Sequence, residues 1–444
     1  MPLLSHALTK TYSGILLPDF PADTLNIFRR FGETNISSIK TRLMMENKTL
    51  WAVSVSGSIR SIGFGATWPF MAIFFNRDLG VPILLVGIIF TLLAISSIAF
   101  SVVGGWLADK FGRRVTLLVG GFNGILIYSL ISVFIAVHLS VLFIAAGFVL
   151  SSSSGSLIFP SSTALVSDVT SRADRTIAYG IYRILTNVGW AIGPIMGAYV
   201  YDLGMEWIFA IIATSSLIQF LVILFFVHDR RIYTRKTRTK ISMISYDRYL
   251  ILFSVGTFFI MMISTQFSVT LPTFAANHVG IPVSAIGYIF AVNGAVVVLG
   301  QYPLNALFSR VSDVTTMIIG SLFYSAGYLL VGFSGSLLQL MLDMIVITVG
   351  EDLVSPSLNS IVSKIAPEDR VARFMSFNGM VNSAARAIGP SVGTIFLSLY
   401  LYNGPEVWGT IDIFGITSIV ILIFFGRLLR ARQSPERISD TQDV

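Results

Sequence analysis

Twelve long apolar stretches run through this chain and limit what it can fold into more than any other feature. A helix needs roughly 20 predominantly apolar residues to cross the hydrocarbon core of a bilayer. The stretches lie at 52–76, 82–108, 114–137, 140–167, 176–201, 205–228, 248–275, 282–309, 314–334, 337–364, 373–400 and 405–428. Only 12% of the residues are charged, whereas soluble domains average about 25%. The pattern predicts an all-α polytopic membrane protein with twelve transmembrane helices.

Lysine and arginine are distributed unevenly between the two sides that twelve spans define. Of the 30 Lys and Arg residues, 26 lie in segments on the same side as both termini. Cytoplasmic loops carry such an excess, so we expect cytoplasmic termini in a multi-pass protein of the plasma membrane. The net charge of +7 is then a signal of topology and does not indicate nucleic-acid binding.

Cysteine and histidine usage restricts the chemistry of the chain. It has no cysteine, and its four histidines lie at or beyond the ends of the apolar stretches. Disulfides and thiolate metal sites are therefore excluded, and a histidine-ligated metal within the membrane is not expected. We predict no metal site and no bound cofactor.

Polar segments divide the chain into two halves. The basic stretch "HDRRIYTRKTRTKISMISYDR" (228–248) falls midway through the spans. We expect a cytoplasmic tail at 1–50, a six-helix bundle at 51–228, a linker at 229–247, a second six-helix bundle at 248–428 and a cytoplasmic tail at 429–444. Met44 or Met45 is an equally good start codon, because the apolar part begins near Trp51.

The two halves repeat each other in sequence. "GVPILLVG" (80–87) returns as "GIPVSAIG" (280–287), and "AIGPIMG" (191–197) returns as "AIGPSVG" (387–393). "FPSSTALVSDV" (159–169) likewise parallels "SPSLNSIVSKI". Transporter folds are commonly built from such repeats, with the substrate site near the midplane where the repeats meet. The repeats predict two pseudo-symmetric six-helix bundles.

The loop between the second and third stretches reads "GWLADKFGRR" (105–114). Its glycines permit a tight turn and a close helix approach, and its aspartate can accept bonds from an arginine or a helix N-terminus. The pattern resembles the signature loop of the major facilitator superfamily. That resemblance implies a cytoplasmic latch, closed in the outward-open state and formed by Gly105, Asp109, Gly112, Arg113, Arg114 and Asp168. The alternative is that the basic residues only follow the positive-inside distribution.

The fifth stretch contains a second pattern, Gly180-x8-Gly189-x3-Gly193-Pro194-x2-Gly197. It is similar to the glycine-proline signature of the family's antiporters, except that Ala198 replaces the final glycine. Small residues let helices pack closely, and proline removes a helix hydrogen bond and bends the axis. The alternative is generic close packing, and a related Gly-Pro-x2-Gly in the second half shows that part of the pattern reflects the internal symmetry.

Ionisable residues at membrane depth are costly and are functional candidates by default. The candidates are Arg60, Arg183, Asp343, Glu351, Asp352 and Arg386. We predict that Glu351, near the middle of the tenth stretch, couples transport to protons, with Arg386 as its counter-charge and with Asp352 beside it. The alternative is a Glu351–Arg386 ion pair that only fixes packing.

Four further predictions concern a substrate cavity. In the family's fold the first, fourth, seventh and tenth spans line the cavity, which makes Gln266 a candidate contact. Asn293, Arg60 and Arg183 are the other candidates, although both arginines can also snorkel towards the interface. The fourth stretch holds "SSSSGS" (151–156) and lacks the arginine that the family's drug–proton antiporters usually carry there.

These features favour a secondary active transporter that works by alternating access. The leading interpretation is proton-coupled efflux of an amphiphilic or drug-like small molecule, as in the family's twelve-span drug–proton antiporters. The alternative is a proton-coupled importer of a small metabolite such as a sugar or an organic acid. An enzyme is not predicted, because the spans contain no catalytic arrangement of the serine–histidine or metalloprotease type. We expect a monomer whose partners are a small-molecule substrate and the lipid bilayer.

Overall fold

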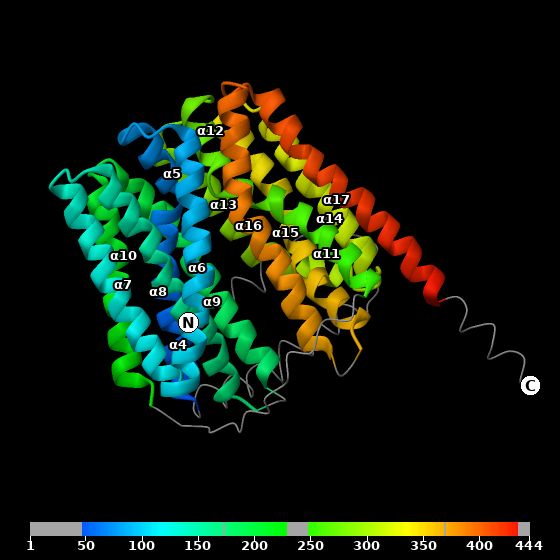
Figure 1. Ribbon diagram of the computed structural model, residues 1–444, viewed down its shortest axis with the longest axis horizontal. Coiled ribbons are helices and arrows are strands. Elements are labelled where there is room, and N and C mark those ends of the chain that lie inside the picture. The colour runs from blue at the N-terminus through cyan, green and yellow to red at the C-terminus, as the bar shows by residue number, and fades with distance from the viewer. Residues whose placement is uncertain (1–46, 172–173, 229–246, 368–369, 434–444) are drawn as a thin grey trace, which may run out of the picture.

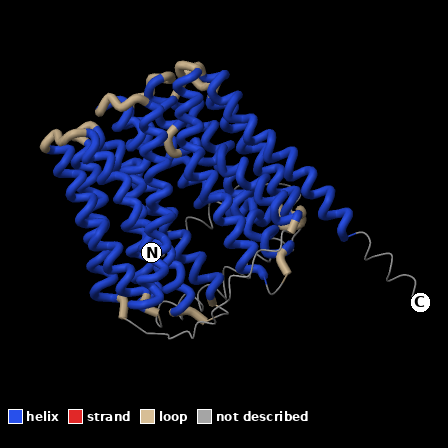
Figure 2. The backbone as a smooth tube through the Cα atoms, viewed as in Figure 1, coloured by secondary structure: helices blue, strands red, loops and turns tan. Residues whose placement is uncertain are grey.

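The computed structural model describes residues 47–171, 174–228, 247–367 and 370–433, and within these ranges the regular elements are helices (Figures 1 and 2). Residues 1–46 of the predicted N-terminal tail, 229–246 of the linker and 434–444 of the C-terminal tail lie outside the described residues. The first half contains α4 (Lys48–Thr67), η2 (Trp68–Phe70), α5 (Met71–Ile73), η3 (Phe74–Asp78), α6 (Ile83–Phe111), α7 (Arg113–Ala136), α8 (Val141–Asp168), α9 (Arg175–Tyr201) and α10 (Met205–Phe226). The second half contains α11 (Arg248–Ser264), η4 (Thr265–Phe267), α12 (Thr270–Asn277), α13 (Val283–Leu307), α14 (Asp313–Val331), α15 (Leu337–Ile365), α16 (Val371–Leu399) and α17 (Gly404–Gln433).

The first and seventh spans are broken at corresponding places. α4 gives way to the 3₁₀ turn η2, which begins with Trp68 and Pro69, and α11 gives way to η4, which is followed by α12. Proline lacks a backbone N–H and interrupts a helix ladder. Together with their continuations these two segments complete the twelve predicted spans.

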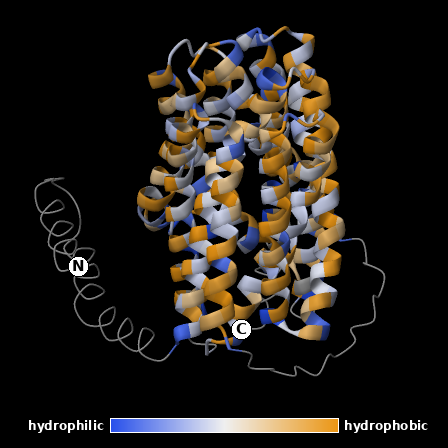
Figure 3. Ribbon diagram, turned by 90° about the vertical axis from the view of Figure 1, so that its left-hand side faces the viewer, coloured by the Kyte–Doolittle hydropathy of each residue, from blue (hydrophilic) through white to orange (hydrophobic). Residues whose placement is uncertain are grey.

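Eight helices in the described part of the chain are long and apolar enough to cross a membrane. The other four spans are the first, fifth, tenth and eleventh, and these carry the intramembrane charges that the sequence indicates, including Arg60, Arg183, Glu351 and Arg386. Figure 3 shows hydrophobic residues along the length of the helices, with hydrophilic ones at both ends and some at mid-height. The chain is a multi-pass membrane protein, and these four spans carry the candidate charges, whereas the uncharged candidates Gln266 and Asn293 lie in the seventh and eighth spans.

The helices pack in the same pattern in both halves. In the first half α4 packs on α9 and α10, α6 on α8, and α7 on α8 and α10. In the second half α11 packs on α16 and α17, α13 on α15, and α14 on α15 and α17. The halves meet through two equivalent pairs, α9 with α13 and α6 with α16. The predicted architecture of two pseudo-symmetric six-helix bundles is confirmed.

Glycines of the fifth span allow α9 to pack closely against α4, the helix of the first span. A Cβ at Gly193 would lie 2.5 Å from the Ile62 carbonyl oxygen of α4, and Gly189 and Gly197 face α4 in the same way. Real Cβ atoms do not approach so closely, so only glycine allows this packing. Gly180 of the same pattern meets nothing within 4 Å. The predicted close packing therefore holds for the later glycines of the pattern.

We call the end of the molecule that carries the loops after η3 and α12 the far face, and the opposite end the basic face. In Figure 1 the two groups of helices converge towards the far face, near α5 and α12, and diverge towards the basic face. At the far face the Asn277 Nδ2 donates to the Asn76 Oδ1 at 2.8 Å and to the Tyr402 hydroxyl at 3.2 Å. Further from the far face, the two halves are also joined by the Thr91 hydroxyl of α6, which donates to the Ala387 carbonyl oxygen of α16 at 2.8 Å.

The repeated Gly-x-Pro motifs end at the seam between the halves. A Cβ at Gly87 of α6 would lie 2.9 Å from the Ser391 Cα of α16, and a Cβ at Gly287 of α13 would lie 2.7 Å from the Ala198 Cβ of α9. The last glycine of each repeat is therefore a point of close contact between halves. The internal repeat of the sequence corresponds to a repeated inter-half contact in the structure.

Candidate functional site

A cavity of about 360 Å³ opens inside the first half, between α4, α6, α7, α8 and α10. Its volume lies within the range of small-molecule pockets. Aromatic residues form much of its wall, namely Phe64, Trp68, Tyr128, Phe148, Phe159 and Phe209. Hydroxyl groups line another part, contributed by Thr67, Ser97, Ser101, Ser151, Ser152 and Ser156. Aromatic faces and a few polar groups suit an amphiphilic small molecule.

The serine-rich stretch of α8 supplies the polar part of the wall. Ser151 donates to the Phe148 carbonyl oxygen at 2.7 Å, and Ser156 donates to the Ser97 carbonyl oxygen of α6 at 2.9 Å. Ser101 donates to the same Ser97 carbonyl oxygen at 2.9 Å. Serine hydroxyls can satisfy themselves on nearby helix carbonyls, so this stretch lies within the membrane without losing its helix. The hydroxyl protons of Ser151, Ser156 and Ser101 are therefore used within the protein.

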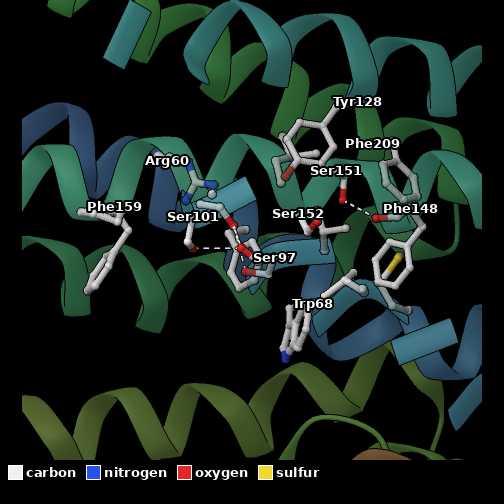
Figure 4. A pocket seen from close by; sticks show the side chains of 18 residues that line it. Arg60, Trp68, Ser97, Ser101, Tyr128, Phe148, Ser151, Ser152, Phe159 and Phe209 are labelled. Carbon is white, nitrogen blue, oxygen red and sulfur yellow. Dashed lines mark hydrogen bonds between the residues drawn. The ribbon is translucent and has the colours of Figure 1, made fainter. Parts of the chain in front are cut away.

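Aromatic contacts order the other part of the wall. The Phe64 and Trp68 rings stack with centroids 5.0 Å apart, and Phe90 meets both Trp68 and Phe148 edge-on at 5.5 and 5.4 Å. Such geometries are favourable for aromatic pairs. In Figure 4 Phe148 and Phe209 lie towards one end of the cavity and Arg60 lies towards the other.

Arg60, on α4, is the one charged residue among those that line the cavity. Its Nε is buried and has no hydrogen-bond partner within the described ranges. Gly155 of α8 leaves space for the guanidinium group, since a Cβ there would lie 3.2 Å from Nη2. Tyr128 of α7 is an electrostatic neighbour. The side chain lines the cavity instead of snorkelling towards the interface.

Glu351 lies on α15 at the middle of the tenth span. Its Oε2 accepts a hydrogen bond from the Asn293 Nδ2 of α13 at 3.1 Å, and the same Nδ2 lies 3.0 Å from the Thr348 hydroxyl. Arg183 of α9, in the other half, interacts electrostatically with Glu351 and also with Asp352, which is buried. The structure thus brings Glu351, Asp352, Asn293 and Arg183 together at the seam between the halves.

The predicted counter-charge, Arg386, is not part of this cluster. It lies on α16, and within the described ranges it forms no ion pair with Glu351 in this conformation. The reason is the packing: α15 packs chiefly on α13 and α14, while α13 also packs on α9, which carries Arg183. Within the described ranges neither arginine forms an ion pair with Glu351, and Arg183 is the one that acts on it electrostatically.

Gln266 does not line the cavity. It is fully buried in η4, where its Nε2 donates to the carbonyl oxygens of Met262 at 2.8 Å and Gly389 at 3.1 Å. Its Oε1 accepts from the Thr270 hydroxyl at 2.5 Å. These bonds satisfy backbone carbonyl groups near the helix break, and the bond to Gly389 connects η4 to α16. The predicted substrate contact is, in this conformation, a structural residue.

The charged loop of the sequence lies at the basic face, between α6 and α7. Gly112 has a φ of 95°, a left-handed conformation that favours glycine, so the predicted tight turn is confirmed. The Arg113 Nε lies 3.6 Å from the Asp168 Oδ2, and the Arg114 Nη2 donates to the Leu224 carbonyl oxygen at 2.9 Å. A Cβ at Gly105 would meet nothing within 4 Å, so the close approach predicted there is absent from this conformation.

Asp109 lies exposed at the end of α6. Its predicted role in the latch belongs to the outward-open state and stays a prediction.

The sequence matches the model of the Major Facilitator Superfamily over residues 53–267 and 253–443. The chain belongs to the Major Facilitator Superfamily. It is a secondary transporter of the membrane and not an enzyme.

Other members of the Major Facilitator Superfamily resemble the chain over most of its length. It is 26% identical over 355 residues to the uncharacterized MFS-type transporter YttB of Bacillus subtilis, covering 77% of this chain and 86% of the relative. It is 23% identical over 360 residues to the quinolone resistance protein NorA of Staphylococcus aureus, covering 79% of this chain and 89% of NorA.

Solved structures of the superfamily share the fold. A mutant of the nucleoside transporter NupG superposes with a TM-score of 0.72 at 15% identity, over 85% of this chain and 99% of that one. A POT family transporter in complex with 5-aminolevulinic acid gives a TM-score of 0.68 at 16% identity, over 84% of this chain and 94% of that one. At this identity the likeness establishes the fold alone.

Asp412 of this Major Facilitator Superfamily member is not among the residues predicted from its sequence. This residue of α17 is buried and accepts a hydrogen bond from the Ser325 hydroxyl of α14. The apolar stretch 405–428 contains two acidic residues, Glu406 near its start and Asp412 well inside it, and the inner position is the signal that identifies Asp412. The aromatic wall is also unforeseen, because Phe64, Phe148 and Phe209 read as ordinary apolar residues until helix packing turns them to one cavity.

Proposed function

We propose that this transporter exports an amphiphilic, drug-like small molecule in exchange for protons. The observation that carries the proposal is the charge cluster at the seam, where Asn293 of α13 donates to Glu351 at 3.1 Å and α13 packs on α9, which carries Arg183. A ligand shifts a conformational equilibrium only through an interaction that differs between the two states. A charge pair that bridges the halves gives proton binding such an interaction.

The coupling step follows from the charges. Ionised Glu351 attracts Arg183 across the seam, whereas protonated Glu351 does not. Protonation of Glu351 therefore favours the conformation in which the two halves attract each other less at the depth of Glu351. Asn293 positions the carboxylate by donating to its Oε2 at 3.1 Å. Asp352 adjoins Glu351 and interacts with it electrostatically, so the two carboxyl groups take up protons as a coupled unit.

The expected topology supports export. The excess of Lys and Arg at the basic face is typical of a cytoplasmic surface. The halves are joined by Asn277, Asn76 and Tyr402 at the far face, so this conformation is then closed to the outside. An exporter takes up its substrate in that state. The similarity to NorA, which is named as a quinolone resistance protein, also favours export of a drug-like molecule.

An importer of a small metabolite is the second candidate. The observation in its favour is Arg60, a lone cation in the cavity lining that suits an organic acid. The direction of transport relative to the proton gradient separates the two candidates, because an antiporter moves substrate and protons in opposite directions.

The test uses the full chain in proteoliposomes with a fluorescent quinolone and an imposed pH gradient. We expect quinolone movement against the direction of proton flow. Glu351→Gln, a neutral mimic of the protonated residue, should abolish the gradient-driven component and preserve quinolone binding measured by fluorescence titration. Asp343→Asn is the matched control on the same helix, because Asp343 is held by Ser334 at 2.5 Å and has no part in the cluster.

Two results count against the proposal. Gradient-driven transport that survives in Glu351→Gln would show that Glu351 is not the coupling group. Movement of the quinolone in the same direction as protons would favour the importer.

A further inference from the structure

We propose that the cavity binds an anionic amphiphile, an aromatic carboxylic acid of about two fused rings, with Arg60 as the counter-charge of its carboxylate. The inference rests on the proposed function in that it assigns a substrate class to the same transporter.

The charge of the lining sets the sign of the ligand. Arg60 is its only charged residue, and the rest of the wall consists of aromatic, aliphatic and hydroxyl-bearing side chains and Gly155. A cationic ligand placed here meets the guanidinium group and no carboxylate. Drug transport in the family does not by itself specify the charge of the ligand. The lining of this cavity specifies it, because its charged residue is an arginine.

The environment of Arg60 leaves its charge without a partner. In the described part of the chain it forms no ion pair, and its buried Nε has no hydrogen-bond partner. A charged side chain inside a membrane is costly unless it is paired or hydrated. Ser101 and Ser156 donate to the Ser97 carbonyl oxygen, so the guanidinium group is the charged donor that the cavity presents, with the neutral Trp68 and Tyr128 groups beside it. A carboxylate is the complement that a planar guanidinium group binds best.

The space around the guanidinium group supports a ligand contact. Gly155 faces Nη2, and the 3.2 Å that would separate a Cβ there from Nη2 is tighter than ordinary van der Waals contact. A side chain at this position would crowd the cation. The glycine in the middle of the serine-rich stretch therefore keeps the end of Arg60 accessible from the cavity.

The shape of the cavity sets the body of the ligand. An engineered cavity of about 150 Å³ holds one benzene ring, and the cavity here is about 360 Å³. That volume accommodates about two rings and a carboxylate. Trp68, Phe148 and Phe209 provide the aromatic wall, and Figure 4 shows Phe148 and Phe209 at a distance from Arg60. The ring system lies against these side chains while the carboxylate meets Arg60.

The test compares three probes that share one ring system and differ in charge. They are 2-naphthoate, the neutral 2-naphthamide and the cation 2-naphthylmethylammonium. Their binding to the full chain in lipid nanodiscs is measured by equilibrium dialysis, with protein-free nanodiscs subtracted. We expect the acid to bind at least about tenfold more tightly than the amide, the range expected for a charge-assisted hydrogen bond, and the ammonium to bind most weakly.

The variants assign the preference to Arg60. Arg60→Gln should lower the affinity for the acid to that for the amide, and unchanged amide binding shows that the cavity is still folded. Arg60→Lys keeps the charge and should keep a preference for the acid. Arg77→Gln, an exposed arginine at the end of the same span, is the control and should change neither affinity.

Equal binding of the acid and the amide by the wild type would overturn the proposal, as would a preference for the acid that survives Arg60→Gln. Absence of acid binding by the wild type would do the same. These failures are distinct from failure of the proposed function. A protein with gradient-driven quinolone transport and no acid preference refutes the anion site alone, and a protein with acid preference and no proton coupling refutes the export mechanism alone.

Discussion

Adding one methyl group at the seam should move the whole transporter from one conformation to the other. In Gly287→Ala the new Cβ would lie 2.7 Å from the Ala198 Cβ and would also press on the Pro194 carbonyl oxygen. Real Cβ atoms essentially never come within 3.0 Å of another heavy atom, so α13 and α9 must move apart. Overpacking of this kind costs about 1–3 kcal/mol.

That cost applies to the conformation in which the halves touch at the far face and not to the one in which they have separated there. Since about 1.4 kcal/mol corresponds to a tenfold change in an equilibrium constant, the separated state should gain about 5-fold to 150-fold in population relative to the joined one. Gly409→Ala is the control, because Gly409 is a helical glycine whose Cβ would meet nothing within 4 Å.

The absence of cysteine in the natural chain makes the measurement direct. Leu139→Cys and Leu338→Cys place spin labels on exposed far-face positions of the two halves, and pulsed electron resonance then gives their distance distribution. We expect a longer-distance population to grow in Gly287→Ala and not in Gly409→Ala. If Gly287→Ala leaves the distribution unchanged, the seam does not depend on the missing side chain and the reasoning fails.

Two further predictions concern residues outside the seam. Asp109→Asn should lower the turnover rate and leave substrate affinity unchanged, because the latch implied by the loop acts in the outward-open state; a normal turnover rate in transport assays would count against it. Gln266→Leu should lower the free energy of unfolding by about 1–3 kcal/mol, because it strips partners from buried groups such as the Gly389 carbonyl oxygen. Unchanged thermal stability in detergent would show that these groups find other partners.

The sequence predicted the fold well, because membrane spans follow from local composition. The twelve stretches and the turn at Gly112 depend on neighbouring residues only, and the internal repeat already implied two similar halves. The contacts of Glu351 depend instead on how the halves dock. Its counter-charge comes from Arg183 of the other half, which packs alongside through α13 and α9, and no local pattern carries that information.

Arg60 illustrates the same limit within one half. The sequence allowed it to snorkel, since a long side chain near the end of a span often does. In the structure it lines the cavity with its Nη2 beside Gly155, which lies 95 positions further along the chain. The present position of Gln266 has a comparable cause, because the helix break at η4 turns it towards α16, and its role as a substrate contact stays a prediction.

The far-face seam has a consequence for how the protein responds to dissolved salt. Its contacts are made by glycine, alanine, serine, threonine, asparagine and tyrosine groups, and mobile ions screen charges and not such contacts. Among the described residues, the pairs that ionic strength weakens are Arg113–Asp168 and Lys364–Asp313, both at the basic face. In the topology that the basic residues predict, these pairs face the cytoplasm. The far-face contacts would then keep their strength when the salt concentration outside the cell changes.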